Sequence, residues 1–193
     1  MIRLRLIALG LLAGLTMNVA NAGLLPVTVT VLPDGGNFRW TYNIVLPTDS
    51  QLRTGDYFTI YDFGGLVADT NSQPLDWSFQ QTALGPVPPG VEPTDNPTLP
   101  NLTWTYSGPT IVSGSAGLGN FWAVSQYETS TTSAFTARTH RTSDGRIDTN
   151  ITDTSVPVPT GPNTVPEPMT LVMAGLGLPL VGLARRFRRR QLA

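Results

Sequence analysis

Between Gly23 and about Thr154, apolar and polar residues alternate with a period of two in many short runs, and no useful length of chain shows the 3.6-residue period of a helix. In residues 38–44, FRWTYNI, large apolar side chains alternate with Arg, Thr and Asn. Such alternation predicts half-buried strands whose apolar members face one core. Comparable runs or pairs of apolar residues two or four apart occur at residues 27–31, 57–61, 76–80, 101–106, 122–124, 135–137 and 147–151.

Turn residues separate these runs and indicate the fold class. PDGG at residues 33–36 supplies left-handed positions between two strands. Asp144-Gly145 separates two further strands and predicts a hairpin. Residues 85–101 hold six prolines and are expected to form a long exposed loop. Short strands with these turns predict an all-β fold, an antiparallel β-sandwich of the jelly-roll or Ig-like kind.

Charge and cysteine usage exclude several classes of function. Residues 23–164 carry five arginines and twelve acids, a net charge of −7, which argues against nucleic-acid binding. The chain has no cysteine, so disulfides, thiolate metal sites and cysteine nucleophiles are excluded.

The first 22 residues have the parts of a secretory signal peptide in the expected order. Two arginines give a positive start, residues 6–15 form an apolar run, and Ala20-Asn21-Ala22 is a small-x-small cleavage site. We therefore expect a signal helix, export of the chain, and cleavage between Ala22 and Gly23.

The C-terminal end predicts a membrane-spanning helix. Residues 169–184 carry no charge and would extend about 24 Å as a helix, which snorkelling arginines can extend toward the ~30 Å hydrocarbon core of a bilayer. By the positive-inside rule, the basic cluster that follows stays in the cytoplasm, so residues 23–154 lie outside. This cytoplasmic stop consists of Arg185, Arg186, Arg188, Arg189 and Arg190.

The motif Val165-Pro166-Glu167-Pro168 stands directly before this helix. Together with the apolar segment rich in Gly and Leu and the terminal arginines, it resembles the PEP-CTERM sorting signal. The resemblance implies processing by an exosortase, a membrane-embedded cysteine protease-transpeptidase, in Gram-negative bacteria that make exopolysaccharide or biofilm matrix. It also implies an inner-membrane precursor whose final place is the cell surface or the extracellular matrix. Residues 155–164 then form a Pro-rich linker between the domain, residues 23–154, and the sorting segment, residues 165–193.

Catalytic chemistry has few candidate residues. His140 is the only histidine, and its strand phase places it on a polar face with Thr136 and Arg138, where solvent exposure is expected more often than general-base work. Asp56 and Asp62 share a strand face but would lie ~20 Å apart, too far for a catalytic carboxylate pair.

The sequence gives equally little support for a metal site. Residues 69–73, DTNSQ, place oxygen ligands at alternate positions, but Pro74 and Gln80 stand where a calcium loop needs Gly and an acid. An Asx-turn is the simpler interpretation. One histidine without cysteine gives zinc no ligand set. We therefore expect no catalytic residue, no metal site and no cofactor.

The four tryptophans and five tyrosines all lie between residues 23 and 154. Their alternation favours core packing over an exposed sugar-stacking row. We expect a non-enzymatic structural or interaction protein, with exosortase, the membrane and exopolysaccharide as partners. A carbohydrate-binding module is the alternative, and a glycan-active enzyme is a distant third. An exposed row of Trp or Tyr would favour the second, and a cleft with convergent carboxylates would favour the third.

Overall fold

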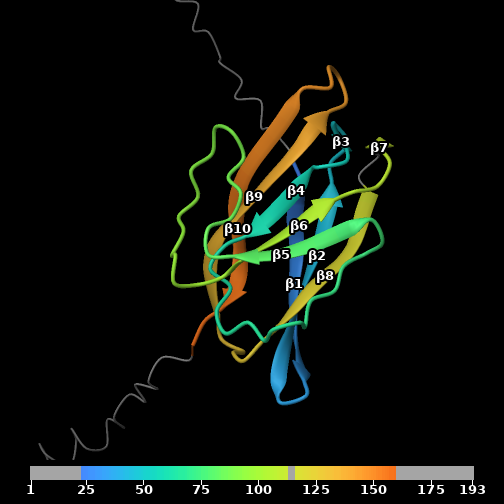
Figure 1. Cartoon of the computed structure of the whole chain (residues 1–193). Helices are drawn as coiled ribbons and strands as arrows, with labels where there is room; N and C mark the ends of the chain where they lie inside the picture. Colours follow the sequence, from blue (N-terminus) through green and yellow to red (C-terminus); the bar gives the residue numbers. More distant parts are fainter. Residues whose placement is uncertain (1–22, 113–115, 160–193) are drawn as a thin grey trace, which may run out of the picture.

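The computed structural model describes residues 23–112 and 116–159, and every regular element in these residues is a β-strand. The pairing is antiparallel throughout these strands, which confirms the predicted all-β antiparallel class (Figure 1). The strands are β1 (Leu25–Asp34), β2 (Asn37–Leu46), β3 (Ser50–Leu52), β4 (Tyr57–Ile60), β5 (Trp77–Thr82), β6 (Asn101–Tyr106), β7 (Ile111–Val112), β8 (Ala116–Ser125), β9 (Ser130–Arg141) and β10 (Ile147–Pro157).

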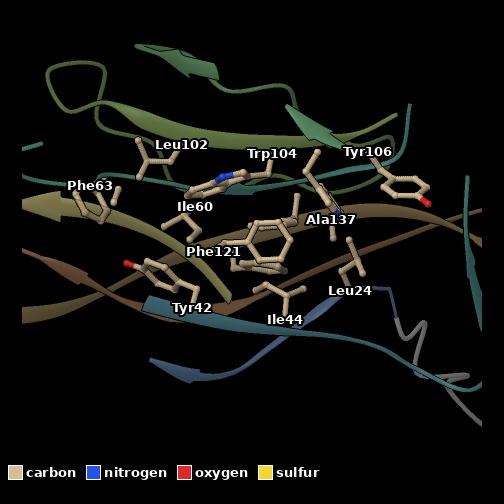
Figure 2. Close-up of a cluster of buried hydrophobic side chains, with 14 of the residues drawn as sticks. Leu24, Tyr42, Ile44, Ile60, Phe63, Leu102, Trp104, Tyr106, Phe121 and Ala137 are labelled. Carbon is tan, nitrogen blue, oxygen red and sulfur yellow. The ribbon is translucent and has the colours of Figure 1, made fainter. Parts of the chain in front are cut away.

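Two sheets contain these strands. The small sheet has the order β1-β2-β8. The large sheet has the order β5-β6-β4-β9-β3-β7, and β10 pairs with β9 along the other edge of that strand. One hydrophobic core lies between the two sheets and takes side chains from both of them (Figure 2).

An aromatic cluster around Phe58 joins the sheets. The Phe58 ring on β4 lies 5.2 Å from that of Trp104 and 5.5 Å from that of Phe135, both in the large sheet. It also meets Phe121 of the small sheet edge-on, with ring centroids 4.9 Å apart. Trp77 completes the cluster at 5.6 Å from Phe58. Offset and edge-on geometries of this kind are the favoured ones for aromatic pairs, so the cluster fixes how the sheets face each other.

The strand phases are as predicted in most runs and wrong in two. Trp40 and Trp104 have no exposed surface, as expected for alternating core residues. In β8, however, Phe121 and Ala123 face the core, and Trp122 is half-buried on the outer face. In β10 the inner positions are polar instead, and the outer isoleucines Ile147 and Ile151 are 49% and 45% exposed.

The polar ends of the buried Tyr42 and Trp40 side chains donate to backbone carbonyls, whereas Trp104 Nε1 is buried without a hydrogen-bond partner. The Tyr42 hydroxyl donates to the carbonyl of Ser155 at 3.0 Å, which links β2 of the small sheet to β10 of the large one. The Trp40 indole Nε1 donates to the carbonyl of Tyr127 at 3.0 Å. These bonds let large aromatic side chains be buried without the cost of an unpaired polar atom.

The predicted turns are present. Gly35 and Gly36 have φ angles of 59° and 87° between β1 and β2, a conformation that glycine adopts without strain. The β9–β10 hairpin closes at Asp144-Gly145, where Gly145 has a φ of 68°. Its amide donates to the carbonyl of Arg141 at 3.0 Å.

Residues 83–100 connect β5 with β6 and contain no strand, as their prolines predict. Most of the segment is exposed, as predicted, and parts of it pack on the outer face of the large sheet. The Tyr61 hydroxyl donates to the Pro86 carbonyl at 3.2 Å. Gly85 lies so close to Thr59 that a Cβ would come within 2.8 Å of its methyl group. The central part of this face is therefore covered by the protein itself.

The C-terminal boundary of the domain differs from the predicted one. Strand β10 continues to Pro157, so Ser155–Pro157 belong to the sheet rather than to the linker predicted at 155–164. The physical reason is that Val156 is fully buried in the core. Residues 1–22, 165–168 and 169–184, with the terminal arginines, lie outside the described residues. In the part of the chain that is described, no helix is long and apolar enough to cross a membrane.

We expect Tyr42→Phe to lower the free energy of unfolding by about 1 kcal/mol, because it removes the hydroxyl that bridges the two sheets. Urea denaturation followed by circular dichroism measures the change. Tyr57→Phe is the matched control, since Tyr57 is half-buried on the outer face and should shift stability by less than about 0.5 kcal/mol. Equal effects of the two variants would contradict the bridging role of Tyr42.

Candidate functional site

Of the predicted site residues, Gly23 is the one that the structure describes. It is buried against Asn150, whose Oδ1 would lie only 2.8 Å from a Cβ at this position. Asn150 Nδ2 also donates to the carbonyl of Leu24 at 2.9 Å. A side chain at the position where the mature chain is expected to begin would therefore require the Asn150 side chain to shift. Ala20, Ala22 and the sorting-motif residues lie outside the described part of the chain.

A buried charge cluster surrounds Asp56, in the turn between β3 and β4. The Asp56 side chain has no exposed surface. Its Oδ2 accepts a hydrogen bond from the backbone amide of Arg53 at 2.8 Å and lies 3.0 Å from His140 Nδ1. Its Oδ1 lies 3.5 Å from Arg138 Nε, which forms an ion pair with it. A buried carboxylate needs such partners, since an unpaired charge in the interior is strongly destabilising.

The sheet register brings these residues together. Tyr57 pairs with Arg138 where β4 meets β9, so Asp56 lies just beyond the end of that ladder. Arg138 and His140 are two residues apart on β9 and share its outer face. The Arg138 guanidinium also lies over the Tyr57 ring, 5.7 Å from its centroid. The turn at residues 53–56, strand β4 and strand β9 thus meet at the Asp56 carboxylate.

The structure corrects the expectation of a solvent-exposed His140. Its side chain is only 13% exposed, because it contacts the buried carboxylate of Asp56. A buried Asp that holds a His by Nδ1 can orient the ring, as in a catalytic triad, but a triad also needs a nucleophile at the other ring nitrogen. Among the described residues, Asp56 is the hydrogen-bond partner that we find for His140. The cluster ties the turn at residues 53–56 to β9.

The second predicted acid, Asp62, belongs to a different site. It lies beside a pocket of about 330 Å³ that Glu92 and Asp153 also line. Asp62 Oδ1 accepts from the backbone amide of Asn96 at 2.8 Å, and its Oδ2 accepts from the Ser133 hydroxyl at 3.0 Å. Both oxygens therefore anchor the long loop to β9. Asp56 and Asp62 have different hydrogen-bond partners.

The segment 69–73, which the sequence does not predict to be a calcium loop, forms internal hydrogen bonds. Asn71 Nδ2 donates to the Gln73 side-chain oxygen at 3.0 Å, and the Thr70 hydroxyl donates to the carbonyl of Val67. Asp69 has a φ of 58° at the tip of this segment. Within residues 23–112 and 116–159, no group of three or more His, Asp or Glu side chains is arranged to hold a metal ion.

A second pocket of about 370 Å³ lies on the outer face of the small sheet. Trp122 and Val124 of β8 line it, together with residues of the β1–β2 turn and of the segment 67–70. The sequence analysis missed this site because it assigned Trp122 to the core. The signal was the adjacent pair Phe121-Trp122: neighbouring strand residues point to opposite faces, so one of two consecutive aromatics must face outward.

We expect Asp56→Ala to lower the free energy of unfolding by about 3 kcal/mol, since it leaves the Arg53 amide, His140 and Arg138 without their shared acceptor. Chemical denaturation measures this loss. Asp144→Ala is the control, because Asp144 forms an exposed ion pair with Arg141 at 3.3 Å and such pairs contribute under about 1 kcal/mol. A small effect of Asp56→Ala would show that water replaces the lost contacts and that the cluster is not a structural tie.

Asp148 predicts a pH dependence of stability. It is 4% exposed on the inner side of β10, and burial raises the pKa of its carboxyl above 3.8, partly offset by Arg141. The folded state therefore holds this proton more tightly than the unfolded state, and the carboxyl's contribution to stability falls as pH rises from the unfolded pKa through the raised one. We expect Asp148→Asn to raise the urea midpoint at pH 7 and to have little effect at about pH 3. An equal gain at both pH values would contradict this assignment.

Comparison with known proteins gave no relative from which to take a function: a scan against protein-family models and a search of curated proteins each found no match to this chain. The PEP-CTERM resemblance of the C-terminal segment therefore stays a prediction from its motif. The function of the domain has to be argued from its own residues.

Proposed function

We propose that this chain is an exported bacterial protein of the cell surface or extracellular matrix, sorted through its PEP-CTERM segment by an exosortase, with a non-enzymatic structural or interaction role. The observation that carries the proposal is the order of the segments along the chain. A signal peptide, a β-domain, a Pro-rich linker, the VPEP motif, an apolar segment and an arginine cluster follow one another. Each step of export, membrane retention and processing has its own segment.

The packing of the domain supports this order. The buried core cluster begins at Leu24, two residues after the expected signal cleavage position Ala22, and ends at Val156, nine residues before the sorting motif. No core residue within the described part of the chain comes from beyond these two positions. A domain with its own core keeps its fold when the segments that flank it are cleaved off. We infer that its two packed sheets form a β-sandwich.

The rival functions receive unequal support. Three of the four tryptophans, Trp40, Trp77 and Trp104, are core residues, so a carbohydrate-binding role depends on the half-buried Trp122. A glycan-active enzyme would use the carboxylates around the Asp62 pocket, but Asp62 itself anchors a loop. The interaction role comes first, with carbohydrate binding as the second candidate.

We expect Glu167→Ala to leave membrane insertion intact and to stop processing, so that precursor accumulates in the inner membrane. The reason is that Glu167 stands between two prolines that hold it extended, the form in which proteases bind their substrates. Fractionation and intact-mass measurement in a host with an exosortase test this. Glu128→Ala, an exposed acid of the folded domain, is the control and should mature normally. Normal maturation of Glu167→Ala would make the tail a simple permanent anchor.

A further inference from the structure

One wall of the pocket on the outer face of the small sheet is held in place by hydrogen bonds. The segment before β5 is bonded to β8: Ser72 and Trp122 exchange backbone hydrogen bonds of 2.9 and 3.0 Å. The Val67 amide donates to the carbonyl of Val124 at 2.9 Å. The Thr70 hydroxyl in turn accepts from the Val124 amide at 3.2 Å. The segment therefore forms one wall of the pocket, on the edge of β8, and the β1–β2 turn forms the other.

The indole of Trp122 is held in place beside this pocket. The Arg39 guanidinium lies over the Trp122 ring, 4.4 Å from its centroid. Arg39 is held in turn by Asp34, whose Oδ2 accepts from Nε at 2.9 Å and from Nη2 at 2.7 Å. The guanidinium occupies one face of the indole, and Trp122, unlike Arg39, is among the residues that line the pocket. An aromatic surface that is oriented before binding loses little entropy when a ligand packs on it.

The rim of the pocket presents polar groups that both donate and accept. Asn37 contributes a side-chain amide, and Asp34 and Asp69 contribute carboxylates on opposite walls. Because both Arg39 bonds end on Asp34 Oδ2, the other oxygen can accept from a ligand hydroxyl. Gly35 in the turn has a φ of 59° and no side chain, so a ligand can approach the backbone there.

The charge of the site selects the class of ligand. Arg39 neutralises Asp34, and none of the residues that line the pocket is cationic, so an anion finds no counter-charge there. A ligand cation would meet only that one exposed carboxylate, and exposed single charges contribute little. An aromatic floor with amide and carboxylate walls instead matches a ring that has an apolar face and hydroxyls at its edge. The volume of about 370 Å³ lies in the usual range for small-ligand pockets.

We propose that this pocket binds a neutral saccharide unit of a polysaccharide, with a pyranose ring packed on Trp122 and its hydroxyls bonded by Asn37, Asp34 and Asp69. The inference rests on the proposed interaction role and names its ligand class. It does not depend on export, on the sorting segment or on exosortase.

The test uses the full chain, purified in lauryldimethylamine oxide because this detergent has no sugar headgroup. Its intrinsic tryptophan fluorescence is titrated with four neutral oligosaccharides, maltohexaose, cellohexaose, mannohexaose and chitohexaose, and with acidic trigalacturonate. We expect saturable binding of at least one neutral oligosaccharide with a change in emission, since Trp122 is the tryptophan that lines the pocket. Trp122→Ala should weaken that binding about tenfold or more, as truncation of an aromatic anchor does.

Tyr57→Ala is the matched control. Tyr57 is a half-buried aromatic with an arginine over its ring, like Trp122, but it lies on the outer face of the large sheet. The Tyr57→Ala variant should bind the neutral oligosaccharide as tightly as the wild type does. Asn37→Ala and Asp69→Gly, on opposite walls, should each weaken binding while the thermal unfolding midpoint stays nearly unchanged, since glycine adopts the left-handed backbone of position 69 without strain. These two variants cover the case in which Trp122→Ala misfolds.

Three results would overturn the inference: no binding of any of the four neutral oligosaccharides, binding of trigalacturonate alone, or neutral binding that persists in Trp122→Ala and Asp69→Gly. The assay contains no exosortase and no processing step. Its failure would therefore leave the sorting proposal standing, and a failure of sorting would leave saccharide binding unaffected.

Discussion

The rest of the structure depends on the contact between the two sheets at Phe58. The chain has no cysteine, so no covalent link can hold the sheets together, and their alignment has to come from side-chain packing. Phe58 contacts the rings of Trp77, Trp104 and Phe135 within the large sheet and that of Phe121 across the interface. Each aromatic pair contributes about 0.5–1.5 kcal/mol beyond its buried area. With the core fixed in this way, the outer faces are free to carry ion pairs, loops and a pocket.

Period-two alternation predicts which residues of a strand share a face, and it predicted β2 and β6 well because each has large aromatics on one face only. It failed at Phe121-Trp122, where both faces carry an aromatic, and in β10, where polar residues such as Asp148 face inward. The hairpin of β9 and β10 was predictable from its turn residues, but the pairing of strands far apart in the sequence was not. Tyr57 pairs with Arg138 some eighty residues later, and the period of a strand carries no information about its neighbour.

Strand period carries no information about neighbouring segments, and for this reason the Asp56 cluster was not predicted from the sequence. The strand phase placed His140 and Arg138 together on the outer face, and the structure agrees. What the phase could not show is that the turn before β4 brings a fully buried carboxylate against that face. A histidine on a polar strand face is exposed only if nothing packs on it. Here Asp56 does, and the expected exposed imidazole becomes part of a buried ion cluster.

The outer faces of the two sheets differ in how far other parts of the chain cover them, and this difference decides where a ligand can bind. On the large sheet, the loop at residues 83–100 packs on the central strands and buries Thr59, Thr103 and Thr136. The Thr149 hydroxyl of β10 also donates to the carbonyl of Pro89 in this loop. On the small sheet, Thr28, Thr30 and Asn43 are exposed, and the covering segment stops at the edge of β8. The outer face of the small sheet therefore stays open around Trp122, where an aromatic side chain outside the core has polar groups on both sides.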